Sequence, residues 1–88
     1  MGIFKQQLSE LLSLPKEVIL NLPQITIIGY QEINIENYKN IIELTSEKVR
    51  INTSSGILLV AGHDLLLKSL TSENLILSGN ILKLEYLL

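Results

Sequence analysis

His63 and Asp64 are the only histidine and the only aspartate of the chain, and they follow Gly62 directly. A general acid–base pair needs two side chains that converge, whereas neighbouring residues of extended chain point in different directions. A metal site would need at least one more well-placed ligand, and no His-x-His or Glu-x-x-His spacing is present. Both residues are better explained as parts of a turn.

Serines near glycines are the other residues that could suggest catalysis or phosphate binding. Ser54, Ser55 and Ser78 lie beside Gly56 or Gly79, but no G-x-S-x-G nucleophile motif and no G-x-G-x-x-G phosphate motif occurs. Turn formation explains these serines better than catalysis does. We therefore expect no catalytic, cofactor-binding or metal-binding residues, no cofactor, and a protein that is not an enzyme.

A polar segment, Glu36-Asn37-Tyr38-Lys39, interrupts an otherwise aliphatic pattern. It is a candidate interaction patch, with Tyr38 as an anchor of the kind enriched at interfaces. The structural alternative is a turn in which Asn37 takes a left-handed conformation and Tyr38 covers the edge of the core. Both interpretations place this segment between two strands.

The elements around these residues have the period of β-strands. From Pro15 onward apolar and polar residues alternate, with turn signals every eight to ten residues. This spacing predicts an all-β fold, mainly an antiparallel meander, sandwich or roll, and the alternative is a short β-solenoid. Two similar segments, 45–60 and 71–84, each join apolar runs through Ser-Gly, which predicts two β-hairpins.

Residues 1–14 carry the helical pattern and precede a single β domain at 15–88. One face of this predicted amphipathic helix collects Phe4, Leu8, Leu11 and Leu12. The helix could dock onto the sheet or a partner chain, or lie in a membrane interface. Because its polar face has one lysine, docking is favoured.

Composition points to an interaction partner. The chain has 88 residues, of which 47% are hydrophobic and 18% are charged. A domain of this size and composition cannot bury all its aliphatic side chains alone, so we expect a homo-oligomer or a protein partner. The net charge is -2 and no basic stripe is present, which argues against nucleic-acid binding. No apolar run approaches the ~18 residues of a transmembrane helix, and no signal peptide is recognisable; the expected location is cytoplasmic.

Several short segments of the sequence resemble those of one known family. The segments Pro23–Gly29, Ile35–Lys39 and Val49–Thr53 with Gly56, in that order and spacing, resemble the YabP/YqfC family of sporulation proteins. The Leu-Pro-x-x-Val motif at Leu14–Val18 is closest to the YqfC branch. The family pattern has His where this chain has Tyr38, so no histidine chemistry carries over to that loop.

The resemblance implies a biological setting. Members act in the mother cell of endospore-forming bacteria, with no established catalytic activity, and the YqfC branch is usually encoded beside a larger membrane protein. The expected function is a non-enzymatic structural or interaction module, a scaffold that self-associates or binds that membrane protein, with no transmembrane segment of its own and a location peripheral to a membrane. The alternative is a small ligand- or lipid-binding regulatory β module.

Overall fold

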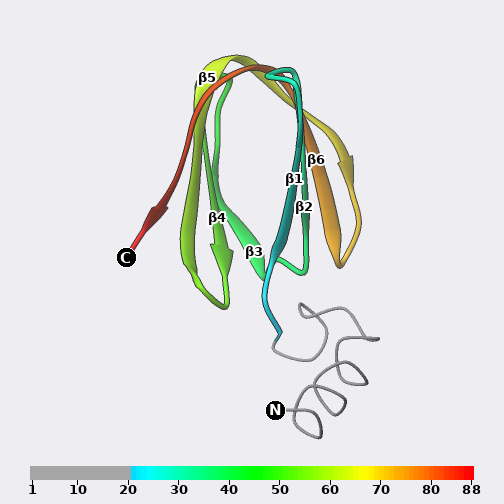
Figure 1. Ribbon diagram of the computed structural model, residues 1–88, viewed down its shortest axis with the longest axis vertical. Coiled ribbons are helices and arrows are strands. Elements are labelled where there is room, and N and C mark those ends of the chain that lie inside the picture. The colour runs from blue at the N-terminus through cyan, green and yellow to red at the C-terminus, as the bar shows by residue number, and fades with distance from the viewer. Residues whose placement is uncertain (1–20) are drawn as a thin grey trace, which may run out of the picture.

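Six antiparallel strands make up the computed structural model, which describes residues 21–88 (Figure 1). They form one sheet in the order β1-β2-β6-β5-β4-β3. The strands are β1 (Gln24–Ile28), β2 (Glu32–Glu36), β3 (Asn40–Leu44), β4 (Lys48–Thr53), β5 (Gly56–Leu70) and β6 (Asn74–Leu87). The predicted all-β antiparallel fold is confirmed, and the β-solenoid alternative is wrong because every strand pair is antiparallel.

The two longest strands bend and divide this sheet into two layers. The first half of β5 pairs with β4 and with the second half of β6, while the first half of β6 pairs with β2 and with the second half of β5. In Figure 1 both strands arch over the top of the molecule, and their halves descend on opposite sides. The sheet therefore folds back on itself, and its concave faces enclose the core.

Aliphatic side chains from both layers fill the space between them. Alternation in β2 and β4 buries every second residue, as the sequence pattern of Val49 and Ile51 predicts. The buried hydrophobic cluster consists of Ile33, Ile35, Val49, Ile51, Leu58, Val60, Leu65, Leu75 and Leu77. Burial of nine aliphatic side chains at roughly 1.5–3 kcal/mol each is the main force that holds the two layers together.

The bend is produced by irregular pairing and by two glycines. Register shifts fall between Ala61 and Gly62 and between His63 and Leu66. A Cβ on Gly79, whose φ is +133°, would lie 2.5 Å from the Asp64 carbonyl oxygen, and one on Gly62 would clash with the Asn80 carbonyl. Only glycine lets the two strands cross this closely.

One of the two predicted hairpins is confirmed and the other is wrong. Residues 45–60 contain the β4–β5 hairpin, with Ser54 and Ser55 as its turn. In the second segment Gly79 lies in the middle of β6, so the runs on either side of it are two halves of one strand. Likewise, the predicted turn at residues 61–64 is the bend within β5. A glycine that permits a bend leaves the same sequence signal as a glycine that closes a turn.

The predicted helix at residues 1–14, with Phe4, Leu8, Leu11 and Leu12, lies outside the described residues, as does the boundary at residue 15. Within residues 21–88 the strands form one continuous sheet. The described part of the chain contains no helix with the length and apolarity that crossing a bilayer requires.

Candidate interaction surface

The segment Glu36–Lys39 connects the two layers at the end opposite the bend. Asn37 has a φ of 63°, the left-handed conformation that the structural alternative predicts. Its N–H donates to the Glu73 carbonyl at 2.6 Å, and its side-chain amide donates to the Leu22 carbonyl at 2.9 Å. The chain therefore turns here from β2 into β3 with its backbone held by two neighbouring segments.

Tyr38 closes the edge of the core beside this turn. Its ring packs against the buried cluster, and its phenol donates to the Thr71 carbonyl oxygen at 2.5 Å. The Lys39 N–H donates to the Asn52 carbonyl at 2.8 Å, which starts the β3–β4 pairing. These contacts give the segment a structural role, and a binding role for Glu36, Asn37, Tyr38 and Lys39 stays a prediction.

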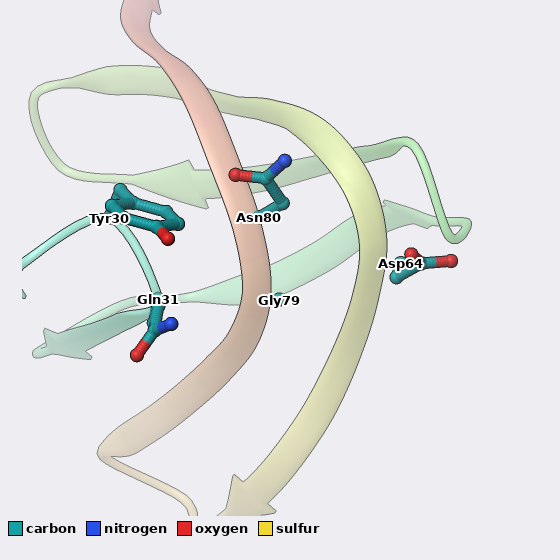
Figure 2. A pocket seen from close by; sticks show the side chains of 5 residues that line it. All are labelled: Tyr30, Gln31, Asp64, Gly79 and Asn80. Atoms are coloured by element: carbon teal, nitrogen blue, oxygen red, sulfur yellow. The ribbon is translucent and has the colours of Figure 1, made fainter.

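His63 and Asp64 lie at the bend of β5, and both side chains are exposed. Asp64 has a φ of 54°, so it shapes the bend. The two strands cross next to an open pocket of about 360 Å³, lined by Tyr30, Gln31, Asp64, Gly79 and Asn80. Figure 2 shows Tyr30 and Gln31 on one side of β6, whereas the Asp64 carboxylate points away on the far side of β5.

The arrangement around this pocket offers little chemistry. Its side chains do not converge on a common point (Figure 2), and none of them belongs to the buried cluster. In residues 21–88 no group of three His, Cys, Asp or Glu side chains is placed to hold a metal ion. The pocket therefore does not provide the apolar interior cavity that the ligand-binding alternative needs.

The serines have the local roles that turns require, with one exception. The Ser54 hydroxyl donates to the Asn21 carbonyl, and the Ser55 N–H donates to the Thr53 hydroxyl at 3.1 Å. Ser78 does not lie in a turn but in β6, where it is paired with Glu32 and Leu66. The turn interpretation is thus confirmed for the first two and wrong for Ser78.

Exposed apolar side chains along the strand edges are the feature that residue-by-residue motif searching missed. Leu66 and Leu70 on β5 are 64% and 53% exposed, and Leu82 on β6 is 63% exposed. Further exposed apolar side chains on the strands are Ile27, Ile28, Ile42, Leu44, Tyr86 and Leu87, and Tyr30 and Leu88 are exposed just outside them. The aliphatic excess in the composition was the signal for such a surface, but composition alone could not locate it.

The free edges of the sheet coincide with several of these residues. Besides the outer strands β1 and β3, the long strands β5 and β6 each extend beyond their shorter neighbours. Leu66 and Leu70 lie in the extension of β5, and Leu82, Tyr86 and Leu87 in that of β6. Such edges present unpaired backbone groups to other chains. The arrangement is therefore suited to binding another protein strand.

Comparison with known protein families places the described residues in a family. A model of the YabP family matches residues 21–88, which is the whole described part of the chain. No curated protein and no solved structure matches the sequence significantly.

Proposed function

The chain belongs to the YabP family, and from this we propose that it is a sporulation protein of the mother cell that works by binding other protein chains, without catalysis. The observation that carries the proposal is the pair of apolar strand extensions in β5 and β6, with Leu66 64% exposed and Leu82 63% exposed. Apolar side chains beside unpaired peptide groups favour strand addition from a partner. The chain acts as a scaffold in this proposal, and self-association is its first binding activity.

We further infer membership of the YqfC branch from the Leu14–Val18 motif, which precedes the matched residues. This narrower assignment brings a second partner, a larger membrane protein encoded nearby. The chain would then be peripheral to a membrane on its cytoplasmic side and held there by that partner. Co-purification of the two proteins from sporulating cells tests this part separately.

The main test is genetic, in an endospore-forming host. Deletion of the gene is expected to lower the yield of heat-resistant spores, and the intact chain is expected to restore it. Restoration should fail with Leu66→Lys and Leu82→Lys together. A partner strand that adds to either extension would have to bury the charge of the new lysine, which opposes strand addition. The double variant must accumulate to the normal level, since both side chains are exposed and their replacement leaves the core intact.

Alanine substitutions separate this proposal from an enzymatic one. His63→Ala and Glu36→Ala are each expected to restore sporulation to the intact level. Asp64→Gly and Asn37→Gly replace the alanine variants at these two positions and are expected to do the same, since glycine tolerates the positive φ of both residues. Loss of sporulation in the His63 or Asp64 variant, with a folded protein at normal abundance, would contradict the non-enzymatic proposal. Loss confined to the Glu36 or Asn37 variant would instead indicate that the Glu36–Lys39 segment binds a partner.

A further inference from the structure

One half of β6 has a free edge. β2 pairs with β6 only along Asn74–Ser78, and the β1–β2 turn adds hydrogen bonds from the Gly79 and Ile81 N–H groups, the second of them to the Tyr30 carbonyl at 2.8 Å. Beyond Ile81, β6 pairs with β5 on one side, and no described residue pairs with its other side. Figure 1 shows this end of β6, in red, at the margin of its layer.

Alternation along the paired strands indicates which peptide groups face this free edge. The two-residue turn makes Thr53 and Gly56 the closing pair of the β4–β5 hairpin, so Gly56 and every second residue after it direct their backbone groups toward β4. The Gly62 N–H, which donates to the Glu47 carbonyl, has the same direction.

The residues between them, Leu59 and Ala61 among others, direct their backbone groups toward β6. Their partners on β6 are Glu85 and Lys83. Lys83 and Glu85 are therefore hydrogen-bonded to β5, and the peptide groups of Leu84 and Tyr86 face outward. The free edge has its donors and acceptors at these two residues.

The charges on either side of Leu84 would be complementary to those of a second copy of the strand that runs antiparallel to the first. Lys83 precedes Leu84 and Glu85 follows it, and the two side chains are half exposed, with 3.3 Å between Nζ and Oε1. If a second copy of the strand runs antiparallel with Leu84 opposite Leu84, Lys83 of each copy lies opposite Glu85 of the other. Both charges are then paired across the strands, which is a favourable cross-strand arrangement.

Neighbouring registers lack this complementarity. A two-fold axis at Glu85 would place two carboxylates opposite each other, which is destabilising. An axis at Tyr86 would place Glu85 opposite Leu87 and would not bring Lys83 of one copy opposite Glu85 of the other. The charge pattern thus selects the register centred on Leu84, in which Leu82 lies opposite Tyr86 of the second copy.

The other free edges are less suited to pairing. β1 and β3 have five residues each, and β3 has a register shift between Ile41 and Glu43. The extension of β5 has one between Leu67 and Ser69. Shifts of this kind interrupt the regular row of backbone groups that a partner strand needs. The β6 extension has one shift at its start, at Leu82, and is regular from Lys83 to Leu87 in its pairing with β5, which includes the residues on either side of Leu84.

We propose that two copies of this chain join antiparallel through residues 82–86 of β6, about a two-fold axis at Leu84, so that two layers continue as one sheet across the dimer. This inference rests on the proposed function and specifies its first partner as a second copy of the chain. Backbone hydrogen bonds at Leu84 and Tyr86 and the apolar contacts of Leu82 supply the affinity. The Lys83–Glu85 pairs set the register and orientation.

A charge-exchange experiment tests the proposal. In sedimentation velocity at low salt the intact chain is expected to form a dimer, and Lys83→Glu and Glu85→Lys are each expected to weaken it by about tenfold or more, because four like charges then meet at the axis. An equimolar mixture of these two variants should dimerise again, as should the double exchange Lys83→Glu/Glu85→Lys. Glu73→Lys makes the same change of charge as Glu85→Lys, but at an exposed residue in the β5–β6 turn, and it should leave the dimer unchanged.

Engineered cysteines test the register, since the chain has no cysteine of its own. In the proposed register the two Leu84 Cα atoms are about 5.5 Å apart, within disulfide range. The two Tyr86 positions are four residues out of register, roughly 14 Å apart. Leu84→Cys should therefore form a disulfide-linked dimer under mild oxidation, and Tyr86→Cys should not.

Three outcomes overturn the two-fold edge dimer. They are a monomeric intact chain at all concentrations, an oligomer that Lys83→Glu does not weaken, and preferential cross-linking through Tyr86→Cys. An oligomer that Lys83→Glu leaves intact would show self-association through another surface and would leave the proposed function in place. The proposed function itself would be contradicted by a different result, loss of sporulation in the His63 or Asp64 variant.

Discussion

Gly79 and Gly62 are the residues that let one sheet act as two layers. Each lies where β5 and β6 cross, and a Cβ on either would meet the backbone of the other strand. Gly79 also has a φ of +133°, which side chains with a Cβ rarely adopt. The nine buried side chains come from both layers, so burial of the core depends on this crossing.

Gly79→Ala is therefore expected to destabilise the fold by about 2–4 kcal/mol, from backbone strain together with the contact with Asp64. Gly29→Ala is the matched control, since Gly29 also has a positive φ, +57°, but no atom lies within 4 Å of the added Cβ. Its expected cost is about 1 kcal/mol, from conformation alone. Urea unfolding followed by circular dichroism measures both. Equal losses of unfolding free energy in the two variants would show that the close approach of β5 and β6 at Gly79 does not add to the cost of the substitution.

Sequence reasoning at this scale recognised a change of chain direction at residues 61–64 but could not identify it as a bend within one strand. Gly62, His63 and Asp64 carry the composition of a turn, and a turn and a bend both need small residues and positive φ. What distinguishes them is the contact between Asp64 and Gly79, two residues that are close only after β5 and β6 have paired. Local patterns hold no information on such a contact.

At the scale of elements, the β2–β3 connection decides how the two layers meet at the end opposite the bend. Only three residues, 37–39, separate β2 from β3. Asn37 reverses the chain direction with its left-handed φ, and Tyr38 reaches the β5–β6 turn through its hydrogen bond to Thr71. The connection thus ties three parts of the sheet together.

Tyr38→Phe tests how much this tie contributes. Loss of the phenol hydroxyl removes one hydrogen bond and leaves the Thr71 carbonyl to water, so we expect a loss of about 1 kcal/mol in the free energy of unfolding. Tyr30 is 60% exposed, and Tyr30→Phe should change stability by less than about 0.5 kcal/mol. If Tyr38→Phe were as stable as the intact chain but weakened binding to a partner, the segment would be an interaction patch rather than a structural tie.

Strand content could be predicted from the sequence, whereas strand length could not. The alternation of Val49 and Ile51 with polar residues identifies β4 correctly. β5 has 15 residues and β6 has 14 residues. They are this long because bulges keep each strand paired across the bend, and a bulge locally breaks the alternation that marks a strand. The free edge of β6 follows from this extra length, so the candidate interaction surface could not be found before the pairing was known.

At the scale of the whole molecule, the excess of aliphatic residues is divided between a core and the sheet margins. Within residues 21–88 nine side chains form the buried cluster, while Leu66, Leu82 and other large apolar residues remain exposed at the strand extensions. Composition predicted that such an excess would exist, and the topology determines where it lies. Two copies joined through β6 would cover part of it and continue the sheet without a change in either fold.

The proposed dimer edge lies wholly within residues 21–88, which leads to a prediction about the predicted helix at residues 1–14. A chain that lacks those residues should still dimerise, with a dissociation constant within about threefold of the full chain, because the backbone groups of Leu84 and Tyr86 are unaffected. Lys83→Glu in the shortened chain should then yield monomers. Light scattering over a concentration series measures both.

The opposite result would assign assembly to the helix. If removal of residues 1–14 alone yielded monomers while Lys83→Glu in the full chain did not, Phe4, Leu8, Leu11 and Leu12 would make the contact, as a docking helix requires. Substitution of Leu8 and Leu12 by serine in the full chain tests this contact directly, with circular dichroism as the check that the sheet still folds. We expect that variant to remain a dimer, because the charge pattern around Leu84 already supplies a self-complementary edge within the sheet.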